Sequence, residues 1–298
     1  MATDPPFRVL NDQRCVVAII DVETGAAEVV IDTHEMLLEA PNWTLDGAAL
    51  VLNGNGRLWR FDLASRELAD ITPPGIPSLN NDHVLDPDGE HIYLSADDGH
   101  LYRSTLDGLV DAAGLERVSS TAGLLHFLHG VSPDGRELAF IGIERQPDGS
   151  WGAGAVFALQ LGDGAYRRLT DGTSPADGSE YSPDGDWIYF NTEEFDGHAQ
   201  IARMQTDGSG VEQLTFDERV NWFPHLAPSG ALAVYLAFPG GTVGHPADRW
   251  VDVMLVRDGE WQAARSVARV FGGQGTMNVN GWDPSGTRLA FVSYPLVE

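Results

Sequence analysis

A short turn motif that recurs six times constrains the fold of this chain more than any other feature. Five of the six copies contain Pro followed by Asp or Ser and then Gly, and successive copies lie 42 to 56 residues apart. Pro presets the backbone for such a turn, and Gly accepts the positive φ that it requires. The spacing is typical of four-stranded propeller blades. The copies span residues 44–47, 86–89, 132–135, 182–185, 227–230 and 283–286.

An apolar run rich in β-branched and aromatic residues follows each turn, as in 138–141, 187–190 and 289–292. Runs of this kind predict strands. Further strands follow in most units, for example 57–62 and 67–72. No amphipathic helical pattern is evident, so the sequence predicts an all-β fold.

The two ends of the chain complete each other. The last turn leaves room for only two strands, ending near Tyr294, whereas the chain begins with an additional strand pair at 16–21 and 28–31. Joining these strands in one blade closes a ring and removes free sheet edges. We therefore predict a six-bladed β-propeller in which the N- and C-terminal strands share a blade, with residues 1–298 forming a single domain.

The charge balance limits the partners that the chain can bind. It contains 44 acidic and 18 basic residues, for a net charge of -26, and it has no lysine. Broad binding of nucleic acid or of an anionic membrane is therefore not expected. Schiff-base chemistry on lysine is excluded.

The N-terminus and the single cysteine add two expectations. Residues 1–6 contain neither a basic nor an apolar stretch, and no run of 18 apolar residues occurs, so we expect a cytoplasmic protein without membrane insertion. Cys15 lies in an apolar run and is expected to be a buried, inert thiol.

With these turns and the Leu-Thr pairs at 169–170 and 214–215, the chain resembles the TolB-like, WD-repeat-like β-propeller family over its whole length. That resemblance implies a protein-docking platform, a sugar-active lyase or an accessory domain of a peptidase. A weaker resemblance is to the oligogalacturonate lyases, which hold a metal with histidines and a glutamine ahead of such turns. Segment 224–230 is similar to theirs, but Phe223 and Val220 stand where those enzymes have His and Gln.

Polar residues precede several turns, where the innermost strands line the central channel. We expect them to meet at one mouth and to form either a hydrated lining or a binding ring. Their offsets from the turn differ by one residue, which requires bulges because side chains alternate along a strand. As ligands for Mn, Zn or Ni the candidates are His83, His129, Glu180 and His225.

Other candidates lie in two glycine-rich segments, 239–250 and 271–278, which we predict to be loops beside the channel. His245 and Arg249 are the candidate catalytic residues of the first segment. Aromatic residues nearby could stack on a sugar ring, although aromatic side chains more often pack blades together. The candidate ligand-binding residues are Asn221, Trp222, Gln274, Asn278, Asn280 and Trp282.

These observations predict a propeller that binds a small polar ligand, such as a carbohydrate, or a protein partner at the channel mouth. The alternative is a metal-dependent, sugar-active enzyme such as a uronate β-elimination lyase.

Overall fold

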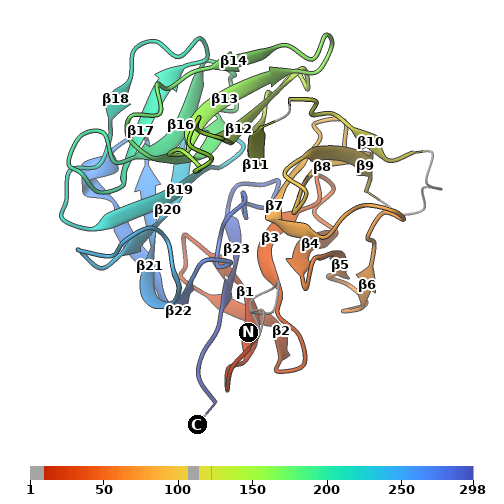
Figure 1. Cartoon of the computed structure of the whole chain (residues 1–298). Helices are drawn as coiled ribbons and strands as arrows, with labels where there is room; N and C mark the ends of the chain where they lie inside the picture. Colours follow the sequence, from red (N-terminus) through yellow and green to blue (C-terminus); the bar gives the residue numbers. More distant parts are fainter. Residues whose placement is uncertain (1–9, 107–113, 122, 298) are drawn as a thin grey trace.

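The six turns end the innermost segments of six antiparallel sheets arranged in a ring (Figure 1). The computed structural model describes residues 10–106, 114–121 and 123–297. The chain is a six-bladed β-propeller, as the repeat predicts. Within the described residues the single helical segment is the short 3-10 helix η1 (Trp261–Ala263).

Five of the sheets contain four strands in chain order, from the channel to the rim. Their bounds are β3 (Glu39–Trp43), β4 (Ala49–Gly54), β5 (Arg57–Asp62) and β6 (Leu68–Asp70); β7 (Leu79–Leu85), β8 (His91–Ala96), β9 (Leu101–Thr105) and β10 (Glu116–Arg117); β11 (Leu124–Val131), β12 (Glu137–Glu144), β13 (Ala155–Gln160) and β14 (Tyr166–Arg168); β15 (Ala176–Tyr181), β16 (Trp187–Thr192), β17 (Gln200–Gln205) and β18 (Glu212–Gln213); and β19 (Val220–Leu226), β20 (Leu232–Phe238), β21 (Ala247–Arg257) and β22 (Arg265–Gly273).

The sixth sheet joins the two ends of the chain, which confirms the predicted closure. β1 (Cys15–Asp21) pairs with β2 (Ala27–Thr33) on one side and with β23 (Arg288–Ser293) on the other. The predicted innermost strand of this blade is absent, because residues 276–282 contact β23 irregularly, with one isolated bridge between Trp282 and Leu289.

Burial on both faces explains the apolar runs after the turns. Every residue of β4 is buried, because neighbouring blades cover both sides of each central strand. Side chains of adjacent blades interdigitate, as where Ile141 and Val156 of one blade pack with Ile188 and Phe190 of the next. Burial between the blades therefore holds the ring together.

In the described part of the chain, no helix is long and apolar enough to cross a membrane.

A bulge interrupts each of the five regular innermost strands ahead of its turn, as the differing offsets required. In β15 the bulge lies between Asp177 and Glu180, and in β19 between Trp222 and His225. These two bulges fit against each other: a Cβ on Gly178 would lie 3.2 Å from the Cα of Phe223. Side chains on either side of a bulge can therefore face different ends of the channel.

The two glycine-rich segments are only partly loops. The first segment runs into β21, which begins at Ala247, so the loop covers only residues 239–246, and Asp248 and Arg249 lie in a strand. The second begins inside β22, which continues to Gly273. The prediction of loops throughout both segments is wrong because β21 and β22 form an extended hairpin that pairs as far as Ala247 and Gly273.

Candidate functional site

The channel has two openings, and the predicted polar residues are divided between them instead of meeting at one mouth. The turn-side pocket has a volume of about 270 Å³ and is bordered by His83, Glu180 and Asn280. The acid–histidine cavity, of about 310 Å³, is bordered by Asp82, Asp177 and His245. His129 borders both. The bulges cause this division.

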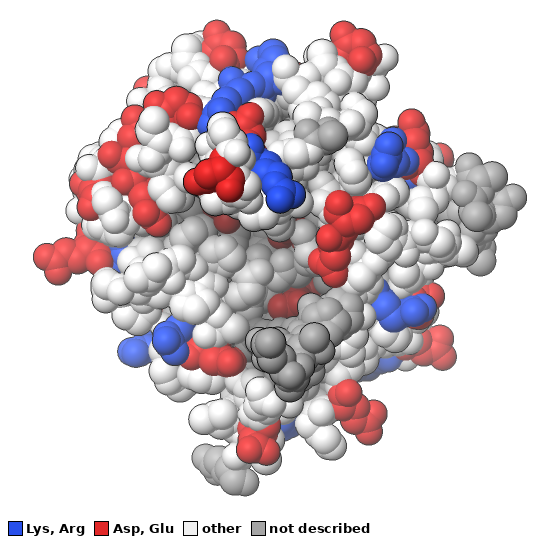
Figure 2. All heavy atoms as spheres, viewed as in Figure 1, with Lys and Arg blue, Asp and Glu red and all other residues white. Residues whose placement is uncertain are grey.

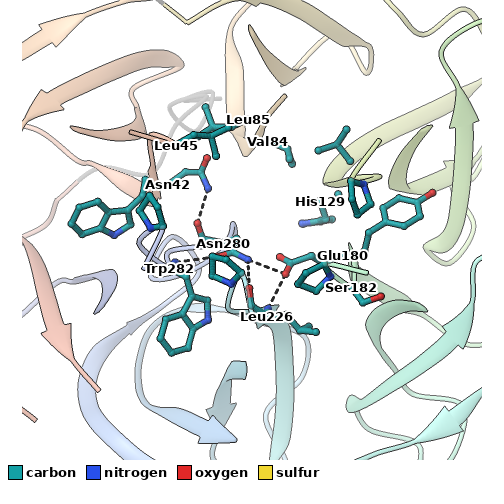
Figure 3. A pocket seen from close by; sticks show the side chains of 18 of the residues that line it. Asn42, Leu45, Val84, Leu85, His129, Glu180, Ser182, Leu226, Asn280 and Trp282 are labelled. Atoms are coloured by element: carbon teal, nitrogen blue, oxygen red, sulfur yellow. Dashed lines mark hydrogen bonds between the residues drawn. The ribbon is translucent and has the colours of Figure 1, made fainter. Parts of the chain in front are cut away.

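Glu180 holds together several parts of the wall of the turn-side pocket (Figure 3). Its carboxylate accepts hydrogen bonds from the backbone N–H of Leu226 at 2.8 Å and from Nδ2 of Asn280 at 2.9 Å. Nδ1 of His225 contacts the second oxygen at 2.7 Å. Glu180 therefore connects three segments of the channel wall.

Both ring nitrogens of His225 face acceptors. Nδ1 faces the Glu180 carboxylate, and Nε2 lies 3.1 Å from the carbonyl oxygen of Met277. These two contacts need two protons. Either both are on the imidazole ring, or one is on the ring and the other is on the Glu180 carboxyl group. Both nitrogens of His225 are therefore engaged, and the contact with Glu180 is structural.

The structure does not bring the four predicted metal ligands together. Glu180 and His225 bind each other, and Nδ1 of His83 contacts Oδ1 of Asn53. Burial lowers the pKa of His83 to about 3, so this imidazole is neutral. Among the described residues, the one group of at least three ligand atoms within 4.8 Å of one another is Asp86, Asp88 and His91.

An arginine already pairs with both carboxylates of that group. Arg103 Nη2 lies 3.0 Å from a carboxylate oxygen of Asp86 and 2.9 Å from one of Asp88. These ion pairs and the His91 contact with Asp88 at 2.7 Å explain why the three residues lie together without a metal ion.

The acid–histidine cavity has Asp177 at its centre. Nε2 of His129 donates to one carboxylate oxygen at 2.9 Å, and Nε2 of His245 lies 3.5 Å from the other. The His245 ring packs against Trp222 and Phe223, with centroids 4.4 and 5.1 Å apart. Residues from β15, β11, β19 and the loop before β21 thus form one cluster.

Burial, charges and hydrogen bonds within this cluster shift the pKa values of its members. Burial lowers the pKa of His129, but the charge of Asp82 and the hydrogen bond to Asp177 outweigh it and raise the pKa to about 9. Burial raises the pKa of Asp177, but its hydrogen bonds with His129 and His245 outweigh that effect and lower it. At neutral pH we therefore expect a His129 cation paired with an Asp177 anion.

Asp82 behaves differently from Asp177. Burial raises the pKa of Asp82 to about 6, although the His129 charge opposes that effect. Within the described part of the chain its carboxyl group forms no hydrogen bond, and 5% of the residue is exposed. Asp82 is thus a buried acceptor that borders the cavity without a hydrogen-bond donor.

Amide side chains complete the cavity wall, and three of them are linked by hydrogen bonds. Asn278 accepts a hydrogen bond from the Gly275 N–H at 2.8 Å and donates to Gln274 at 3.2 Å. Gln274 donates to Asn81 at 3.3 Å. This chain of hydrogen bonds fixes which amide atoms face the cavity.

The remaining predicted residues have other positions. Asn221 is fully buried and donates to Gln200 and Asp217, away from both openings. Trp282 borders the turn-side pocket, but its Nε1 donates to the His225 carbonyl at 3.1 Å. Arg249 is exposed on β21 and borders neither opening, so a role for it in the cavity is not supported.

Sequence analysis missed Asp82 and Asp177. Asp82 belongs to the run Asn80-Asn81-Asp82-His83, which is unusually polar for a buried strand, and this signal could have identified it. Asp177 precedes Gly178, and that pair is equally compatible with an ordinary turn.

The raised pKa of Asp82 predicts a pH-dependent stability difference. The folded state binds the Asp82 proton more tightly than the unfolded chain, so ionisation costs stability as the pH rises through about 4 to 6. Relative to wild type, Asp82→Asn should gain about 2–3 kcal/mol in unfolding free energy between pH 4 and pH 8. Urea unfolding at both pH values measures this difference. Glu35→Gln, at an exposed position, controls for the loss of one charge. If the difference in unfolding free energy between Asp82→Asn and wild type were the same at both pH values, the raised pKa of Asp82 would be contradicted.

Acidic side chains are spread over the face drawn in Figure 2, and its centre is hollowed, with acidic atoms visible inside. With a net charge of -26, the surface favours neutral or cationic ligands over anions.

Comparison with known proteins identifies close relatives. No protein-family model matches the chain. An uncharacterized protein from Agrobacterium fabrum is 37% identical over 289 residues, covering 97% of this chain and 95% of that protein. A solved structure from Agrobacterium tumefaciens, provisionally named TolB, is 34% identical, with a TM-score of 0.86 over 95% of this chain and 99% of that one.

An oligogalacturonate lyase from Vibrio parahaemolyticus has a TM-score of 0.59 at 13% identity, over 94% of this chain and 77% of that one. This similarity is one of fold alone.

Proposed function

The chain belongs to the TolB-like β-propeller family, and we propose that it binds a small hydroxyl-rich ligand of the saccharide class in the acid–histidine cavity. The observation that carries this proposal is the Asp82 carboxyl group, which borders the cavity without a donor. Its oxygens face the cavity, so a ligand hydroxyl can donate to Asp82 in place of water.

The other groups of the wall support a neutral, polar ligand. Asp177, His245 and the amides of Gln274 and Asn278 provide both donors and acceptors, as a polyol requires. Trp222 adds an aromatic surface, which suits the apolar face of a sugar ring. The two carboxyl groups and two imidazoles largely balance in charge, so neither a cation nor an anion is strongly favoured.

The size of the cavity limits the ligand. Its volume of about 310 Å³ is at the lower end of the range for small-molecule sites. We expect it to accommodate one sugar ring, with any additional ring outside the cavity.

A panel of neutral monosaccharides and uronic acids, titrated by NMR against the protein, tests this function. We expect at least one neutral sugar to shift the Trp222 and His245 resonances, and Asp82→Asn to weaken its affinity about 10-fold or more, since a hydrogen bond to a charged group contributes about 1.5–3 kcal/mol. Asp46→Asn, at an exposed turn, is the matched control and should bind like wild type. Equal affinity of the Asp82 variant, or no response to any sugar, would refute the proposal.

A further inference from the structure

The turn-side pocket differs from the acid–histidine cavity in having mainly apolar walls. Leu45, Val84 and Leu85 form one side, and the prolines of the repeated turns contribute to the rim (Figure 3). Leu45 is 51% exposed, which is unusual for a leucine beside a pocket. The volume of about 270 Å³ exceeds the ~150 Å³ that holds benzene in an engineered apolar cavity.

The polar groups of this pocket are mainly hydrogen-bond acceptors. Asn42 is 8% exposed, and its Nδ2 donates to the carbonyl oxygen of Asn280 at 2.6 Å. This contact orients the amide and leaves its Oδ1 without a hydrogen-bond partner among the described residues. Nearby, the Glu180 carboxylate provides a second acceptor, and Nδ2 of Asn280 is already occupied by Glu180 and the Leu226 carbonyl.

Three of the turns carry an ionised aspartate directly after a pocket-lining residue (Leu45, Pro133 or Pro183), and we call these three aspartates the rim carboxylates. Ser or Thr at the first turn position donates to the Asp at the third, at 2.7 Å for Asp46, 2.7 Å for Asp134 and 2.5 Å for Asp184. Hydrogen bonds from the Ala48 backbone and the Thr44 hydroxyl lower the pKa of Asp46. Hydrogen bonds from Ser132 and Ser182 lower the pKa of Asp134 and of Asp184 in the same way.

Positive groups are scarce at this opening. No arginine borders the turn-side pocket within the described chain. His83 is neutral, and the His129 cation is paired with Asp177. An anionic ligand would therefore find no unpaired cation here and would face the rim carboxylates.

We propose that the turn-side pocket is a second binding site, for a small organic cation with an apolar body and a protonated amine. The body would contact Leu45, Leu85 and the turn prolines, and the ammonium would donate to Asn42 and Glu180 while the rim carboxylates attract it. The walls of this site and of the saccharide site share only His129, and the proposal does not depend on the saccharide site.

Three probes that share one apolar body test the charge preference. 2-Phenylethylammonium, 2-phenylethanol and phenylacetate are titrated against methyl-labelled protein at low ionic strength. We expect methyl shifts at Leu45, Val84 and Leu85, with the ammonium bound most tightly and phenylacetate most weakly. No shift at these residues with any probe, or phenylacetate bound as tightly as the ammonium, would overturn the proposal.

Variants of the rim separate charge from apolar contact. The triple variant Asp46→Asn, Asp134→Asn, Asp184→Asn keeps the turn acceptors and removes the charges, so it should weaken ammonium binding about three- to tenfold and leave phenylethanol within about twofold. Leu45→Ala should weaken all probes, whereas Leu296→Ala, at a 63% exposed position outside the pocket, should weaken none. Equal losses for ammonium and alcohol in the triple variant would contradict the role of charge.

Discussion

Replacing Glu180 with alanine is expected to lower the free energy of unfolding by about 3–5 kcal/mol, because it removes one partner of a buried, hydrogen-bonded pair. Glu180 is 8% exposed and accepts hydrogen bonds from the Leu226 N–H and from Asn280. The variant leaves those donors and His225 without their carboxylate partner. Equilibrium unfolding in urea measures the loss.

A second glutamate provides the control for this substitution. Glu212 forms an exposed ion pair with Arg203 at 2.7 Å. Exposed pairs contribute about 0–1 kcal/mol, so Glu212→Ala should be almost neutral. If the two variants lost similar stability, Glu180 would not connect the channel wall as described.

Substitution of Val292 by aspartate is expected to cost about 4 kcal/mol or more, because it places an unpaired charge where the two ends of the chain meet. Val292 is 0% exposed and is opposite Val17 in the β1–β23 pair. Loss of this pairing would open the ring and expose the edges of two strands. Urea unfolding and limited proteolysis of the termini measure the effect.

Val297→Asp is the matched control, since Val297 is 54% exposed and lies only five residues away. It should remain close to wild type in stability. A fully folded Val292→Asp variant with unchanged unfolding would contradict closure of the propeller through β1 and β23.

The fold could be predicted from the sequence because its main determinants are local. Each Pro-Asp-Gly turn specifies its own backbone geometry, and the apolar run after it specifies a central strand. The closure could also be predicted, since the strand pair at 16–21 and 28–31 and the strand at 289–292 each supply too few strands for a complete blade. The irregular path of segment 276–282 could not be predicted from the sequence, because it depends on β23 and on the Gly275 contact with Asn278.

The candidate site was only partly predictable because the bulges decide where side chains point. The Gly178 bulge fits against Phe223, a residue 45 positions away, and no local pattern encodes that contact. His129 and His245 were identified from their residue type, but their shared partner Asp177 resembles a turn residue in the sequence. The pairing of Glu180 with His225, which occupies Nδ1 of the imidazole, likewise appears only in three dimensions.

A structure of the protein soaked with its best saccharide tests the central claim most directly. We expect the sugar ring in the acid–histidine cavity, with a hydroxyl within about 2.5–3.0 Å of the Asp82 carboxylate and a ring face near Trp222. A sugar bound only elsewhere, or a cavity that stays free of sugar while NMR reports binding, would contradict the account.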